Sequence, residues 1–102
     1  MENKIINGHT LIFTLSGNNS FENLTITDRI SNFIADFTDV DIEILNTINN
    51  NLIKFNNAVC KNKGTFVIVS KYSFEQRLNI VPTLQEAQDF IEMEDMERQL
   101  DF

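Results

Sequence analysis

The sequence feature that most constrains the fold is Phe66-Val67-Ile68-Val69, four consecutive apolar residues without a polar interruption. Most of them are β-branched, and the run has the length of a strand rather than of a helix. A strand that is apolar on both sides is covered on both sides, as in a central strand of a parallel or mixed sheet with helices packed on it. Ile80-Val81 is a shorter run of the same kind. The chain is therefore predicted to be an α/β protein with Phe66-Val67-Ile68-Val69 as a central strand.

The start of the chain carries a hairpin signal. Asn7-Gly8 separates residues 4–6 from the apolar-rich residues 9–13, and Asn and Gly tolerate the positive φ angles that a type I′ turn requires. Residues 40–44 alternate apolar and acidic side chains, a pattern that predicts an edge strand with one solvated face. Together with the two apolar runs, these segments predict a mixed sheet of four to five strands.

Three helices are predicted from apolar residues at helical spacing. The first ends near Phe37 and begins either at Ile26 or after a short extended piece, because residues 24–27 alternate with a period of two. The second spans residues 48–59, which are followed by cations and by Gly64 as the C′ glycine. The third begins at the capping box Thr83-Leu84-Gln85-Glu86. The element order is expected to be β-β-α-β-α-β-β-α, which implies helices packed on a sheet with parallel neighbours. The periodic faces predict a core that includes Ile12, Ile30, Phe33, Leu52, Phe55, Val67, Val69, Leu84 and Ile91.

The third helix carries two apolar sides. At about 100° per residue, Leu84, Ala87 and Ile91 lie on one side, whereas Met93 and Met96 lie nearly opposite. One core cannot bury both, so the helix either ends or kinks near Ile91 or offers its second half to another chain. A chain of 102 residues is expected to form a single domain, with residues 92–102 as a candidate protruding helical tail. The candidate interaction surface consists of Phe90, Met93, Met96 and Leu100.

The formal net charge of −7 is concentrated near the C-terminus, where residues 83–102 hold seven acids and one base. Because an acidic chain repels phosphate, nucleic-acid binding is not expected. No apolar stretch is long enough for a signal peptide or a membrane span, and the single Cys60 excludes an intrachain disulfide. The expected location is therefore the cytoplasm.

The usual constellations of catalytic residues are missing from the sequence. His9 is the only histidine and is interpreted as a hairpin residue, so no catalytic, metal-binding or cofactor-binding residue is predicted. A Cys–His nucleophile pair would require His9 to lie beside an exposed Cys60, which is instead expected to behave as a small hydrophobic residue. With three glycines in all, a glycine-rich phosphate-binding loop is excluded.

The C-terminal segment resembles a known family. Val81-Pro82-Thr83-Leu84-Gln85-Glu86-Ala87, followed by an amphipathic helix, is similar to the last strand and helix of STAS domains. From Val81 to the end, the chain is more specifically similar to small STAS-like proteins from Bacteroidetes. The resemblance implies the fold of anti-sigma factor antagonists and a non-catalytic, regulatory or adaptor role in binding another protein. The alternatives are a self-associating structural protein and an accessory partner of an RNA-processing enzyme, and a homodimer is expected.

In signalling STAS domains, a serine of an Asp-Ser-Ser-Gly motif in the loop before the second helix is phosphorylated. The region that matches it, residues 46–52, lacks this motif, and Thr47 carries its only hydroxyl group. The usual serine phosphoswitch is therefore not expected, and Thr47 is the sole candidate phosphosite.

Overall fold

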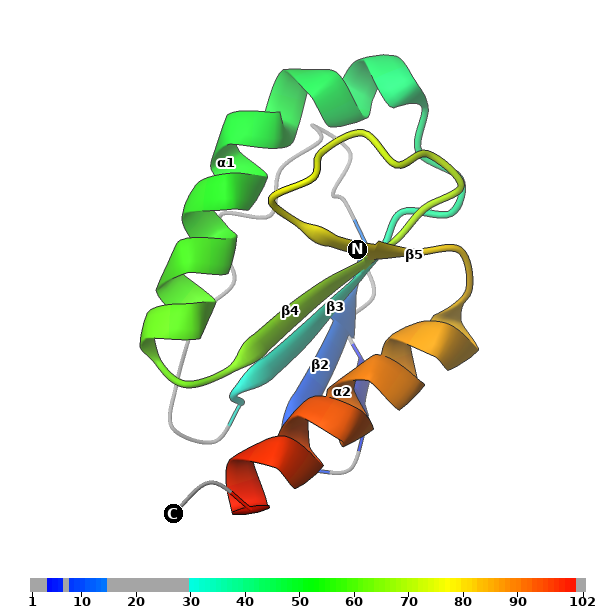
Figure 1. The fold of residues 1–102 in the computed structure, drawn as a ribbon. Coiled ribbons are helices and arrows are strands. Elements are labelled where there is room, and N and C mark those ends of the chain that lie inside the picture. The colour runs from blue at the N-terminus through cyan, green and yellow to red at the C-terminus, as the bar shows by residue number, and fades with distance from the viewer. Residues whose placement is uncertain (1–3, 7, 15–29, 101–102) are drawn as a thin grey trace.

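The computed structural model describes residues 4–6, 8–14 and 30–100, with Lys4 and residues 98–100 described by their backbone alone. Five strands and two helices make up this part of the chain (Figure 1). In chain order they are β1 (Lys4–Ile6), β2 (Thr10–Phe13), β3 (Asn32–Asp36), α1 (Ile42–Lys61), β4 (Thr65–Val69), β5 (Asn79–Val81) and α2 (Leu84–Leu100).

The strands form one mixed sheet in the order β1-β2-β3-β4-β5. β1 and β2 form the predicted antiparallel hairpin, and Gly8 in its turn has a φ of 76°. β2, β3, β4 and β5 are parallel neighbours, with Phe33 opposite Phe66 and Val67 opposite Asn79. The predicted α/β fold with a mixed sheet is therefore confirmed. β4 contains the apolar run and is an internal strand, although β3 is the middle one.

The helix predicted over residues 26–37 is wrong where the structure describes it, because Asn32–Asp36 is strand β3. Residues 26–29 lie outside the described part of the chain. Phe33 and Ala35 are buried on one face of the sheet and Ile34 on the other. A strand that is buried on both faces shows no period of two, so its apolar residues matched a helical spacing by chance.

The edge strand predicted over residues 40–44 is also wrong, because α1 begins at Ile42. The alternating residues 40–44 span the start of the helix, and the apolar series continues from Ile42 through Leu45 and Ile48 to Leu52 at steps of three and four. Asp41 occupies the N-cap position without a side-chain hydrogen bond. The predicted helix over residues 48–59 is confirmed, and it begins six residues earlier than predicted.

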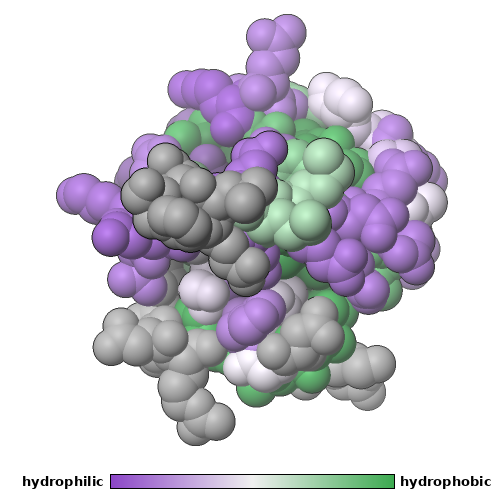
Figure 2. Space-filling view, turned by 60° about the horizontal axis from the view of Figure 1, so that its bottom comes forward, coloured by the Kyte–Doolittle hydropathy of each residue, from purple (hydrophilic) through white to green (hydrophobic). Residues whose placement is uncertain are grey.

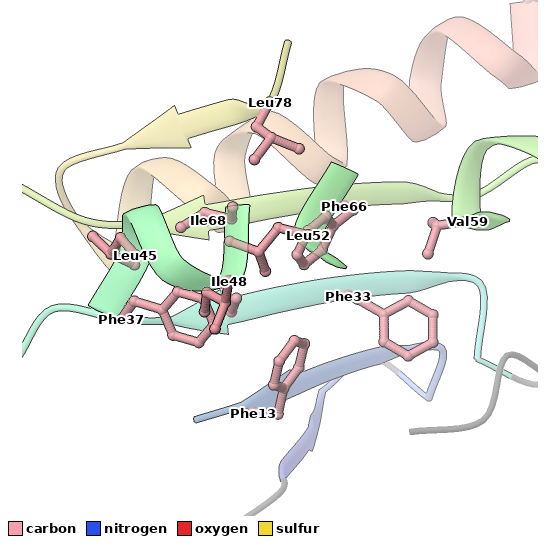
Figure 3. Packing of buried hydrophobic residues seen from close by; sticks show 11 residues of the cluster. Phe13, Phe33, Phe37, Leu45, Ile48, Leu52, Val59, Phe66, Ile68 and Leu78 are labelled. Atoms are coloured by element: carbon pink, nitrogen blue, oxygen red, sulfur yellow. The ribbon is translucent and has the colours of Figure 1, made fainter. Parts of the chain in front are cut away.

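The two helices cover opposite faces of the sheet. α1 packs over a cluster rich in aromatic side chains, in which the ring of Phe55 stands edge-on against Phe33 and Phe66 at centroid distances of 5.1 and 5.0 Å. α2 covers the other face. The α1-side cluster, which is drawn in Figure 3, consists of Phe13, Phe33, Ala35, Phe37, Leu45, Ile48, Leu52, Val59, Phe66, Ile68 and Leu78. The α2-side cluster consists of Ile34, Val67, Val69, Ala87 and Ile91.

Most of the predicted core is confirmed. The members that are buried are Phe33, Leu52, Val67, Val69 and Ile91, and the members that are partly buried against the two clusters are Ile12, Ile30, Phe55 and Leu84.

The strand order has a consequence for ligand binding. α1 connects β3 to β4, and the β4–β5 connection packs its apolar side chains Tyr72, Phe74 and Leu78 into the same α1-side cluster. These two connections therefore lie on the same face. Doubly wound sheets bind ligands where the strand order reverses, and the described strands follow one another in sequence without a reversal.

Neither α1 nor α2 is both long enough and apolar enough to span a bilayer.

Candidate interaction surface on α2

The start of α2 is fixed against the sheet. The Thr83 hydroxyl accepts a hydrogen bond from the Glu86 amide at 3.2 Å, which is one half of the predicted capping box. One turn further on, Ala87 is fully buried, and Ile91 is 4% exposed against Ile34 and its neighbours. The apolar side of the first half of α2 is thus buried in the domain core.

The second half of α2 remains in contact with the sheet. Asn32 in β3 is fully buried, and its Oδ1 accepts a hydrogen bond from the Thr65 amide at 3.1 Å. Its Nδ2 donates to both carboxylate oxygens of Asp95 at 3.4 Å. α2 is a single helix from Leu84 to Leu100, so it neither ends nor leaves the sheet at Ile91.

The opposite side of α2 exposes two large apolar side chains. Met93 is 63% exposed and Met96 is 61% exposed, as their helical spacing predicts. Phe90 is partly buried and packs against the α2-side cluster, so it lies at the margin of this surface. The side chain of Leu100 lies outside the described part of the structure. We call Met93 and Met96, with the acids around them, the methionine face.

Carboxylates flank both methionines. Asp89 and Glu97 lie one turn before and one turn after Met93, and Glu92 lies one turn before Met96. All three acids are exposed. Figure 2 shows a pale green area, with purple hydrophilic residues along part of its border, on the side of the molecule that lies at the bottom of Figure 1. The methionine face is therefore a small apolar area with a negative rim.

A cavity of about 560 Å³ lies between the end of α1, the first half of β4 and α2. It exists because β5 begins opposite Val67, so the preceding residues of β4 have no β5 residue beside them. The lining residues are Cys60, Lys63, Gly64, Thr65, Phe66, Asn79 and Glu94.

Cys60 and His9 are not brought together by the described structure. Cys60 is exposed, which corrects the expectation of a small hydrophobic residue, and it lines the cavity described above. His9 lies in the β1–β2 turn, with Nδ1 at 3.2 Å from the Thr10 hydroxyl, and does not line that cavity. The described residues contain no group of three or more His, Cys, Asp or Glu side chains placed to hold a metal ion.

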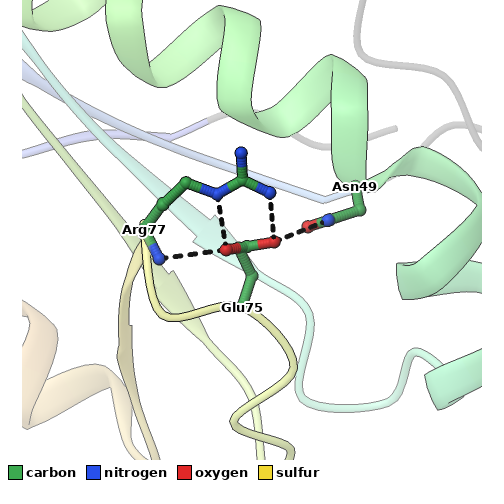
Figure 4. A network of polar contacts seen from close by, with 3 residues as sticks. All are labelled: Asn49, Glu75 and Arg77. Carbon is green, nitrogen blue, oxygen red and sulfur yellow. Dashed lines mark hydrogen bonds and ion pairs between the residues drawn. The ribbon is translucent and has the colours of Figure 1, made fainter.

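A polar network ties the β4–β5 connection to α1 (Figure 4). The Arg77 guanidinium donates to both oxygens of the Glu75 carboxylate at 2.8 and 3.0 Å, and Asn49 Nδ2 donates to the same group at 2.8 Å. These donors, Arg77 first, lower the pKa of Glu75 from 4.5 to about 2. Because it fixes a connection without a helix of its own, we interpret the network as structural.

Thr47 does not lie in a loop before a helix. It sits in the second turn of α1, where its hydroxyl donates to the Glu43 carbonyl at 2.9 Å. The segment between β3 and α1 is residues 37–41, and its hydroxyl-bearing residue is Thr38, which donates to the Asp36 carboxylate at 2.7 Å. The match of residues 46–52 to a loop is therefore wrong.

Sequence reasoning identified the methionines but missed the Asn32–Asp95 contact and the Glu75 network. The Asn32–Asp95 contact and the Asn49–Glu75 hydrogen bond join residues that are distant in sequence, and no local spacing marks such pairs. Comparisons with protein-family models, curated proteins and solved structures found no match to this chain.

Proposed function

We propose that this protein is a non-catalytic, STAS-like module that binds another protein through the methionine face. The observation that carries the proposal is the exposure of Met93 and Met96 on a helix whose other side is already docked on the sheet. Single exposed apolar residues are common on protein surfaces. Two long apolar side chains on adjacent turns instead provide a continuous contact area.

Methionine suits such a contact because its flexible, polarisable side chain adapts to irregular partner surfaces. Full burial of one such side chain contributes about 1.5–3 kcal/mol. With roughly 60% of each side chain exposed, the pair offers about 2–4 kcal/mol on binding, by the same scaling. This favours a moderate, reversible interaction in which further surface takes part.

The test is affinity capture from the source cell, with the full chain as bait and mass spectrometry as the readout. The double variant Met93→Gln/Met96→Gln removes the apolar area at constant charge. Ala58→Gln on the exposed side of α1 is the matched control, and circular dichroism verifies that both variants fold. We expect the wild type and the control to capture the same partner and the double variant to lose it.

Sedimentation of the full chain over a range of concentrations completes the test and addresses self-association. Capture that is insensitive to the methionine substitutions would contradict the role of this surface. A chain that captures nothing and stays monomeric at every concentration would contradict the proposed function as a whole.

A further inference from the structure

The rim of the methionine face presents carboxylates in the positions that a docked partner would approach. Asp89, Glu92 and Glu97 are exposed and lie within one turn of Met93 or Met96. From Leu84 to Glu97, α2 contains no Lys or Arg. Carboxylates only accept hydrogen bonds, so the rim is matched by a partner that supplies cationic donors around an apolar centre.

The surface of α2 favours a helical partner over an extended peptide. The backbone amides and carbonyls in the middle of α2 are paired within the helix, so this face offers almost no main-chain hydrogen bonds. An extended peptide lying on it would leave its own backbone groups unpaired. A helix satisfies its backbone internally and presents only side chains.

We propose that the methionine face docks a basic amphipathic helix of another protein. The apolar side of that helix covers Met93 and Met96, and its Lys or Arg side chains lie against Asp89, Glu92 and Glu97. This inference rests on the proposed function and names the chemistry of the partner. A second copy of this chain is disfavoured as the occupant, because two identical methionine faces would bring two acidic rims together.

The test uses three synthetic helical peptides of equal length that share one leucine stripe and carry Lys, Gln or Glu at the polar positions. Binding to the full chain is followed by NMR of methyl-labelled methionine, with Met1 as a third, internal reference signal. We expect the Lys peptide to shift the signals of Met93 and Met96 and to bind about 10-fold more tightly than the Gln peptide, the gain expected from a few exposed ion pairs. This preference should shrink as salt is added.

Two variants of equal charge separate local contacts from general attraction to an acidic protein. Asp89→Asn/Glu92→Gln/Glu97→Gln neutralises the rim and should weaken binding of the Lys peptide about 10-fold, since each exposed pair contributes a small increment. Asp39→Asn/Asp41→Asn/Glu43→Gln removes the same number of exposed carboxylates around the start of α1. This control should change the affinity less than about 2-fold, because screening limits the reach of distant charges.

Equal weakening by the two triple variants would overturn the inference, since binding would then reflect net charge alone. Stronger shifts of Met93 and Met96 with the Gln or Glu peptide, or dimerisation through the same face, would also overturn it while leaving the proposed function standing. If no peptide shifts these two signals, the inference fails, and the proposed function fails with it if the chain also captures no partner and stays monomeric at every concentration.

Discussion

At the residue scale, the neighbouring residues Lys63 and Gly64 have different roles in the turn that follows α1. The residue with the left-handed backbone is Lys63, with a φ of 61°, and not Gly64, which corrects the predicted C′ glycine. Gly64 is needed for another reason, because a Cβ at this position would lie 1.7 Å from the carbonyl oxygen of Ser31. The glycine thus allows two backbone segments to approach closely, and the lysine carries the conformational strain of the turn.

These roles predict opposite effects of two substitutions. Lys63→Gly should stabilise the protein by about 0.5–1 kcal/mol, because a left-handed backbone costs a non-glycine residue about 1–2 kcal/mol and glycine loses part of that gain to its larger unfolded-state entropy. Gly64→Ala should destabilise it by about 1–3 kcal/mol or more through overpacking. Urea unfolding midpoints at constant m-value measure both. A neutral Gly64→Ala would show that Ser31 does not confine this position.

Glu75 is the residue whose protonation should matter for stability. Its side chain is 12% exposed, and its pKa falls from 4.5 to about 2 on folding because Arg77 and Asn49 donate to the carboxylate. A carboxyl group with a depressed folded-state pKa stabilises the protein fully above the unfolded-state value. That contribution is lost as the pH falls from about 4.5 towards 2.

We therefore expect the stability difference between the wild type and Glu75→Gln to be constant above about pH 4.5 and to shrink as the pH falls towards 2. Arg77→Gln should reduce this pH dependence, whereas Lys71→Gln, which removes a cation from the same connection, should retain it. Thermal unfolding at closely spaced pH values measures the difference. A difference that persists unchanged down to pH 2 would contradict the shifted pKa.

At the element scale, the parts of the fold that follow from local signals were predictable and the parts that depend on burial were not. The Asn7-Gly8 hairpin, strand β4 and the start of α2 each carry a sequence signature. β3 does not, because a strand covered on both faces needs no alternation. The start of α1 was missed because the last residues before a helix and its first turn can mimic a period of two.

In the candidate site, too, the features set by one helix were predictable and the features set by packing between elements were not. Helical geometry alone places Met93 and Met96 opposite Ile91, and both are exposed. The contact between Asn32 and Asp95 spans 63 residues of sequence and depends on how the sheet and α2 are stacked. The spacing of residues within a single helix or strand therefore does not indicate that contact.

The Asn32–Asp95 contact predicts an energetic coupling between β3 and α2. Asn32→Asp should destabilise the protein by roughly 1–3 kcal/mol, because a buried carboxylate then faces Asp95. Asp95→Asn in that background restores an amide donor, so the double variant should recover part of the loss. A double-mutant cycle in urea measures the coupling. Strictly additive effects of the two substitutions would show that the side chains do not interact.

At the scale of the whole molecule, the side chains of the central strands β3 and β4 are buried more deeply than those of the edge strands. β3 and β4 contribute to the clusters on both faces, whereas β1 and β5 are short edge strands of three residues each. Opening of the edges exposes little of the core, while opening of β3 or β4 exposes both clusters. Local stability should therefore fall from the centre of the sheet to its edges.

Native-state hydrogen exchange should reveal this gradient. We expect the amides of Phe33–Ala35 and Phe66–Ile68 to exchange only through global unfolding, and the amides of β1 and β5 to exchange earlier through local opening. Exchange of β3 at the rate of the edge strands would contradict the two-sided packing.

The placement of α2 has a consequence for synthesis in the cell. All five strands that the structure describes precede α2 in the chain, and chains emerge from the ribosome N-terminus first. The strands therefore leave the ribosome before α2 does, and until α2 docks on the sheet, Ile34, Val67 and Val69 have no helix over them. A nascent sheet with one bare apolar face is a substrate for chaperones and for aggregation, and that hazard ends only when the first turns of α2 reach the sheet.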